Sequence, residues 1–353
     1  MLFADTGLSG AQISSLFIIW SVVGFALEVP SGAWADTYSR KKLLTFAPLL
    51  RAAGFALWTF APSYPSFAIG FVLWGASGAL QSGTWEALVY EAAPGIYARL
   101  IGRSEAMSTI AVVAASALAA PVLATGGYRA LGIASVAAAL LTVAVGALLP
   151  ESRGHRDEGD GYLRTLRAGL AAVRSNSTGP QLRHRLLLVA AISGFDALDE
   201  YLPLLIQATG VDAVTVPLLG LVISIGVVVG GWFAGRGTRW TPLALALAAV
   251  SMAVGAASGH PAGIVLVAVA FGVFQWAIAA ADARLQESID DRARATVTSI
   301  AGFGIEVVAV LTFAGYALGS RWTGPGPLFV VAAVPYLVVA VALRRIESIR
   351  SKP

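Results

Sequence analysis

The chain has 353 residues, of which 57% are hydrophobic and only 12% are charged, and its mean hydropathy is +0.75. Soluble domains carry about 25% charged residues, so this composition excludes an ordinary soluble protein and indicates an integral membrane protein. The net charge of +4 does not indicate nucleic-acid binding, because the basic residues occupy short loops between apolar stretches instead of forming one basic surface.

The sequence also argues against several kinds of chemistry. It contains no cysteine, and its three histidines are scattered, so it offers neither a reactive thiol nor a histidine cluster for a metal. It has no G-x-x-x-x-G-K-[ST] motif, which argues against direct use of ATP. We therefore expect no enzyme activity, no cofactor and no metal site.

Apolar stretches long enough to cross a membrane recur along the chain. A membrane-spanning helix needs about 20 apolar residues, and such stretches fall near residues 12–34, 43–61, 66–92, 104–125, 128–149, 186–208, 214–235, 241–258, 262–283, 296–319 and 326–344. They predict an all-α polytopic membrane protein of about eleven transmembrane helices. The polar stretch in the middle predicts three parts, namely an N-terminal bundle at 1–150, a cytoplasmic linker with a basic amphipathic helix at 151–185, and a C-terminal bundle at 186–353.

Basic residues gather on one side of these predicted helices. The turn at 40–42, the linker and the C-terminus carry many of them, whereas the opposite side has only Arg129 and Arg321. The positive-inside rule therefore predicts a multi-pass protein of the plasma or inner membrane with a cytoplasmic C-terminus. An odd number of helices places Met1 outside, so we expect an N-terminal helix to be missing, through either a misassigned start or a real truncation. An apolar stretch of about 20 codons in the upstream reading frame would decide this.

The stretch LEVPSGAWADTYSRKK, residues 27–42, joins the first two apolar spans through a short charged turn. Its Gly32, Asp36, Arg40 and Lys41 resemble the signature loop between the second and third helices of the major facilitator superfamily. The resemblance covers essentially the whole chain and implies a transporter fold of two pseudo-symmetric helical bundles.

Other segments carry the same resemblance. The segment WEALVYE at 85–91 is similar to the end of the fourth helix in the drug-efflux-like group of that superfamily. Gly231, Gly235 and Arg239 repeat the spacing of the first signature, with glycine in place of the aspartate. Such a repeat implies two related bundles that face each other across a central cavity. The glycine pair at 226 and 230 predicts a close helix contact within the fold rather than dimerisation.

The resemblance implies a secondary active transporter that works by alternating access. We expect proton-coupled efflux of a small amphipathic or cationic solute by a monomer that contacts membrane lipid and binds no nucleic acid. Solute uptake on the same scaffold and a non-transporting membrane remnant are the alternatives. The implied gating motif consists of Gly32, Asp36, Arg40, Lys41 and Glu91. In this motif Arg40 pairs with Glu91, and Asp36 accepts hydrogen bonds from the helix start near residue 296.

Ionisable residues inside the apolar spans are costly to keep there, so they are the candidates for proton coupling. Glu28, Arg51 and Glu86 fall at similar depths when a rise of about 1.5 Å per residue is applied. They predict either a structural ion-pair cluster across three helices or a carboxylate that exchanges protons as the cavity opens.

A second acidic group falls near the middle of the 186–208 span. Asp196, Asp199 and Glu200 are close enough in sequence for like charges to raise at least one pKa, which suits a reversible proton carrier or a cation site. Glu306 stands alone at mid-span, where a protonated group bonded to a neighbouring helix and a functional carboxylate are both compatible with the sequence.

Amide and aromatic side chains near the expected cavity complete the candidates. Gln81, Trp85, Gln275 and Trp276 offer surfaces that suit an amphipathic or cationic solute. The alternative is that the tryptophans are packing residues or anchors at the membrane interface.

Overall fold

The computed structural model describes residues 1–37, 39–82, 84–150, 179–287 and 294–350. Their regular secondary structure consists of α-helices and short 3-10 helices, which confirms the all-α prediction. Within these residues, seven helices are long and apolar enough to cross a membrane. The chain divides into two compact units, one at Leu2–Gly159 and the other at Asp160–Pro353 together with Met1.

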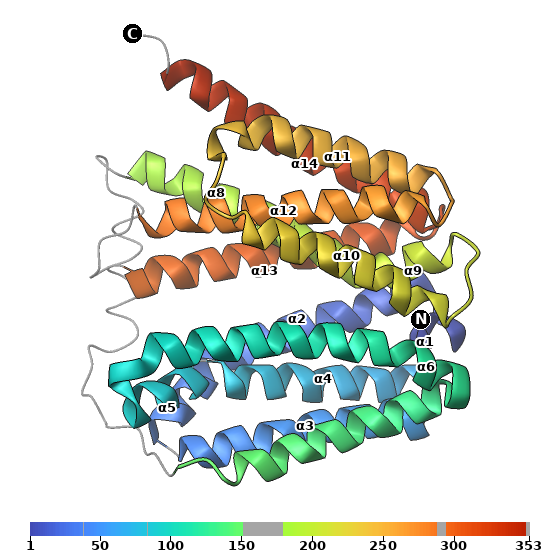
Figure 1. Ribbon diagram of the computed structural model, residues 1–353, viewed down its shortest axis with the longest axis vertical. Coiled ribbons are helices and arrows are strands. Elements are labelled where there is room, and N and C mark those ends of the chain that lie inside the picture. The colour runs from blue at the N-terminus through green and yellow to red at the C-terminus, as the bar shows by residue number, and fades with distance from the viewer. Residues whose placement is uncertain (38, 83, 151–178, 288–293, 351–353) are drawn as a thin grey trace. The chain divides into compact units, whose positions relative to one another are not determined.

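The first unit contains the blue to green helices of Figure 1. They are α1 Leu2–Asp5, α2 Gly10–Thr37, α3 Arg40–Phe60, α4 Tyr64–Gln81, α5 Thr84–Ala92, the 3-10 helix η1 Pro94–Ile96, and α6 Tyr97–Gly146. α6 holds two of the predicted spans, because it kinks at Gly127, where φ is 59° and ψ is −162°. Only glycine adopts such a backbone conformation without strain. The two arms of α6 turn back on each other there (Figure 1).

The turn between α2 and α3 is shorter than the sequence suggests. α2 continues to Thr37 and α3 begins at Arg40, so Asp36 belongs to the last turn of α2 and the basic residues 40–42 form the first turn of α3. The reason is a cap: the Ser39 hydroxyl accepts a hydrogen bond from the Lys42 amide at 3.2 Å and starts the helix at once.

Aromatic rings form much of the core of the first unit. Phe3 of α1 meets the edges of Trp58 and Phe67 at centroid distances of 5.4 and 4.8 Å. Trp20 of α2 stacks on Trp74 of α4 at 5.4 Å. Offset and edge-on ring pairs of this kind stabilise a core beyond the area they bury. The cluster therefore joins α1, α2, α3 and α4 from within.

The second unit contains the remaining helices. They are α8 Gly179–Phe195, the 3-10 helix η2 Asp196–Tyr201, α9 Leu202–Gln207, α10 Thr215–Trp232, the 3-10 helix η3 Thr238–Trp240, α11 Thr241–Ala257, α12 Gly263–Gln286, α13 Arg294–Gly319 and α14 Pro325–Arg350. Four pairs pack extensively, namely α10 with α12, α11 with α12, α11 with α14 and α8 with α13.

α8 begins before the predicted start of the second bundle at residue 186. It starts at Gly179, inside the stretch predicted to be linker. Leu182 and Leu186 lie one helical turn apart and are 6% and 7% exposed, in a core cluster with Leu285 of α12 and Val297 of α13. This apolar face extends the helix. The amphipathic helix predicted within the linker lies outside the described residues.

The predicted span at 186–208 is not one continuous helix. α8 ends at Phe195, six residues of 3-10 helix follow, and α9 begins at Leu202. Pro203 lies in the first turn of α9 and has no amide proton to donate to a carbonyl four residues earlier, which favours a break here. The break places the acidic residues of this span in the 3-10 helix.

Glycines let α10 and α12 approach closely, as their spacing predicts. A Cβ atom at Gly230 would lie 1.8 Å from the carbonyl oxygen of Gly272, and one at Gly226 would lie 2.3 Å from that of Ala268. Such backbone contact is typical of small-residue packing between membrane helices.

Candidate functional site

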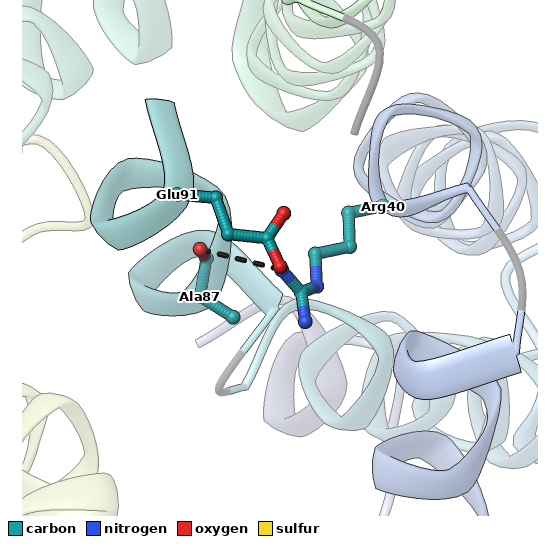
Figure 2. Close-up of polar contacts among 3 residues, drawn as sticks. All are labelled: Arg40, Ala87 and Glu91. Carbon is teal, nitrogen blue, oxygen red and sulfur yellow. Dashed lines mark hydrogen bonds and ion pairs between the residues drawn. The ribbon is translucent and has the colours of Figure 1, made fainter. Parts of the chain in front are cut away.

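The first candidate site joins the start of α3 to α5. Arg40 is only 7% exposed and forms an ion pair with Glu91, and its Nη1 donates a hydrogen bond to the Ala87 carbonyl at 3.4 Å. Figure 2 shows the guanidinium reaching toward both of these groups of α5. A guanidinium this buried needs such partners, because removal from water costs several kcal/mol per charge.

The other residues of the predicted gating motif, Gly32, Asp36 and Lys41, lie close to Arg40 in the sequence. Lys41 follows in the first turn of α3, and its carbonyl accepts a hydrogen bond from the Thr45 hydroxyl at 2.8 Å. Gly32 and Asp36 belong to the backbone of α2. The surroundings of both, and the contact predicted between Asp36 and the helix start near residue 296, lie outside the described residues.

Glu28, Arg51 and Glu86 lie on three helices, α2, α3 and α5. Both carboxylates are on exposed faces of their helices. Arg51 is partly buried, and no described residue forms a hydrogen bond with its Nε. Within the described part of the chain no ion pair links the three. Both readings of this group, a structural ion-pair cluster and a proton-exchanging carboxylate, stay predictions.

The second candidate site is the acidic 3-10 helix η2. A 3-10 helix has three residues per turn, so Asp196 and Asp199 share one face. Asp199 is exposed, and Asp196 and Glu200 are half-buried. Leu198 and Tyr201 are 2% and 0% exposed and anchor the segment in the unit. η2 thus places its carboxylates beside its own apolar anchors.

Aromatic rings from distant parts of the chain pack beside η2. Tyr336 of α14 stacks on Phe274 of α12 with ring centroids 3.9 Å apart and meets the edge of Phe195 at 5.8 Å. Tyr336 is 1% exposed, and among the described residues its hydroxyl has no hydrogen-bond partner. Its ring contact with Phe195 places it next to the end of α8, directly before the carboxylates of η2.

No sequence pattern pointed to Tyr336, because it lies far from η2 along the chain and in an ordinary apolar span. Its contact with Phe195 places it at the helix break that holds Asp196 and Asp199. Carboxylates in such a place can take up and release a proton or attract a cation. No group of three histidine, cysteine, aspartate or glutamate side chains is arranged to hold a metal ion among the described residues.

Two of the predicted cavity-lining residues make bonds within their own unit. Gln81 donates to the carbonyl and the hydroxyl of Ser77 at 3.1 and 3.0 Å. The Trp276 indole donates to the Arg236 carbonyl at 3.0 Å. These contacts favour structural roles for both side chains.

The remaining candidates have different surroundings. The Trp85 indole nitrogen is buried without a hydrogen-bond partner. Gln275 of α12 lies beside Gly231 of α10, and its Cγ would be 3.9 Å from a Cβ at that glycine. Glu306 is half-buried in α13.

Comparison with known proteins supports one family. The sequence model of the Major Facilitator Superfamily matches residues 1–256. No curated protein sequence matches the chain.

Solved structures share the fold at low sequence identity. The nucleoside transporter NupG has 13% identity and a TM-score of 0.75, with 98% of this chain and 92% of that chain covered. A bacterial homolog of the human lysosomal transporter Spinster has 15% identity and a TM-score of 0.68, with coverages of 95% and 87%. A D-xylose-proton symporter has 15% identity and a TM-score of 0.66, with coverages of 95% and 89%. The family model spans most of the sequence and the similar structures are transporters, so the chain belongs to the major facilitator superfamily.

Proposed function

We propose that this protein is a secondary active transporter that works by alternating access and couples the efflux of a small amphipathic or cationic solute to protons. Membership of the superfamily supports solute transport in general. The observation that carries proton coupling is the exposed Asp199 carboxylate in the helix break, on the same face of η2 as Asp196.

Protonation of the Asp199 carboxylate gives the helix break at 196–201 two states that differ in energy. A charged carboxylate within a membrane span needs water or a partner, whereas a protonated one is tolerated beside apolar groups. Proton binding at Asp199 therefore favours a conformation in which the break is shielded, and proton release favours one in which it is wet. A ligand that prefers one of two conformations shifts their populations, which is what coupling requires.

The Arg40–Glu91 pair belongs, in this proposal, to a gate between the bundles at 1–150 and 186–353. Gly32 lies within α2, and Lys41 adds positive charge to the first turn of α3. In the proposed gate Asp36 binds the free amides at the helix start near residue 296. The ion pair fixes the start of α3 to α5 inside one unit. The Asp36 contact is the part that breaks as the bundles move, and the linker at 151–185 joins them on the cytoplasmic side.

Efflux is proposed because the segment 85–91 resembles the drug-efflux-like group. A cytoplasmic C-terminus and a monomeric state are parts of the same proposal. Uptake is the second candidate, since one of the similar structures is by its name a D-xylose-proton symporter. Solute counterflow in vesicles of defined orientation would separate the two directions.

The experiment that tests coupling uses the purified chain in sealed vesicles that contain a pH-sensitive dye. Lipophilic cations, nucleosides, peptides and sugars are added outside in turn. We expect at least one class of solute to change the internal pH. For efflux by antiport, protons move in the direction opposite to the solute, so entry of the solute should raise the internal pH. If no solute from these classes moves protons or is itself transported, the non-transporting alternative replaces this proposal.

A further inference from the structure

The segment between α10 and α11 exposes large aromatic side chains. Trp232 is 78% exposed, Phe233 50% and Trp240 55%. They flank Arg236 and Arg239, and we call residues 232–240 the aromatic–basic loop. Because α10 is a membrane-length helix that ends at Trp232, this loop lies at a membrane surface.

Each arginine of the aromatic–basic loop lies near a ring. The Cζ atom of Arg236 is 5.8 Å from the centroid of Phe233, and that of Arg239 is 5.4 Å from the centroid of Trp240. Both arginines are exposed, and in the described parts of the chain neither takes part in an ion pair. Two cations are therefore presented beside apolar rings with donors still available.

The backbone of the loop is held in place from within the unit. The Trp276 indole donates to the Arg236 carbonyl at 3.0 Å, and the Arg236 amide donates to the Phe233 carbonyl at 3.1 Å. Gly235 adopts a φ of 79°, which permits the turn between the two rings. The arginines thus project from a defined turn.

Arg40, which occupies the position of Arg239 in the first repeat, has different surroundings. Arg40 is 7% exposed and pairs with Glu91. Arg239 has the same spacing from its glycine, but it is exposed and has Gly235 where the first copy has Asp36. Among the described residues the second copy keeps the cation without an ion-pair partner, so a partner from outside the chain can supply the negative charge.

We propose that the aromatic–basic loop binds the headgroup of an anionic phospholipid in the leaflet next to it. Guanidinium groups form paired hydrogen bonds with phosphate oxygens. Tryptophan and phenylalanine rings pack against the glycerol and upper acyl region at the same depth. A net negative headgroup is favoured over a zwitterionic one, because nothing on the loop offsets the two positive charges. This site is independent of the proposed transport cycle.

The test measures lipid binding to the purified full chain in detergent by native mass spectrometry. Phosphatidylglycerol and phosphatidylcholine are titrated against wild type and the R236Q/R239Q variant. We expect wild type to prefer phosphatidylglycerol and the variant to bind it about 30-fold more weakly, since each arginine near a charged headgroup contributes about fivefold. Inorganic phosphate and glycerol phosphate should not compete at the same concentration, because they lack the acyl chains.

The matched control lies on the loop between α13 and α14, where Arg321 is exposed and Trp322 is 74% exposed. Arg321→Gln should leave the phosphatidylglycerol affinity unchanged. The proposal is overturned if R236Q/R239Q binds this lipid as wild type does, if Arg321→Gln weakens binding equally, or if inorganic phosphate competes as well as the lipid. Should the double variant melt abnormally, brominated phosphatidylglycerol provides the second test. It should quench wild-type fluorescence and lose part of that quenching in Trp240→Phe, and equal quenching in both proteins would also overturn the proposal.

Discussion

At the scale of single residues, the buried charge of Arg40 gives the clearest link between sequence and packing in this chain. Arg40 is almost fully buried and its side chain meets α5 at two points, the Glu91 carboxylate and the Ala87 carbonyl (Figure 2). The pairing could be predicted from the resemblance of the motif. The hydroxyl of Tyr336 beside η2 could not, because an unsatisfied group is recognised only once the packing of α14 against α12 is known.

Replacing Glu91 by glutamine should lower the free energy of unfolding by about 2 kcal/mol, because a buried guanidinium loses its counter-charge. We place the effect below that of a fully buried pair, since the Glu91 side chain is 34% exposed. Thermal unfolding in detergent, followed by circular dichroism, measures the change.

Glu86→Gln is the control for this prediction, because Glu86 lies on the same helix, is exposed and has no ion pair among the described residues. Its effect should stay within about 0.5 kcal/mol. Equal destabilisation by the two substitutions would show that the ion pair does not stabilise the fold.

At the scale of elements, the sequence predicts where helices lie better than where they start, stop or break. Windows of apolar residues located the spans, because insertion into lipid depends on the summed apolar character of about 20 consecutive residues. They missed the 3-10 helix at 196–201, since a break of six residues barely changes that sum. They also placed the start of α3 too late, because the Ser39 cap acts through one hydrogen bond.

Close packing of α10 against α12 gives a second prediction. Gly230→Ala would place a methyl group against the Gly272 carbonyl, a backbone atom that cannot move aside easily. We expect destabilisation of about 1 to 3 kcal/mol from overpacking, measured by unfolding in detergent.

Gly220 provides the comparison on the same helix. A Cβ there would meet nothing within 4 Å, so Gly220→Ala should change stability by no more than about 1 kcal/mol and in the stabilising direction, because alanine is the better helix former. If both alanine variants behave alike, the helices do not touch at Gly230 as described.

At the scale of the whole molecule, the chain divides into two compact units at Leu2–Gly159 and at Asp160–Pro353 together with Met1. The family could be inferred from a short motif and its degenerate repeat, and the match over residues 1–256 establishes it. The solute and the direction of transport could not be predicted, because a short motif shared across a superfamily does not specify the side chains that would bind a solute.

The most direct test of proton coupling at η2 compares two aspartates of the second unit. Asp199 lies in the helix break, whereas Asp212 lies in the exposed loop before α10 and accepts a hydrogen bond from the Thr215 amide at 2.7 Å. Hydrogen bonding from Thr215 lowers the pKa of the Asp212 carboxyl, which keeps it charged at neutral pH and outside any proton cycle.

The measurement is solute-driven proton flux in vesicles that contain wild type, Asp199→Asn or Asp212→Asn at equal amounts of folded protein. We predict that Asp199→Asn reduces the flux to the level of vesicles without protein, while Asp212→Asn keeps the wild-type flux. Wild-type flux in Asp199→Asn would contradict the assignment of η2 as the site of proton coupling.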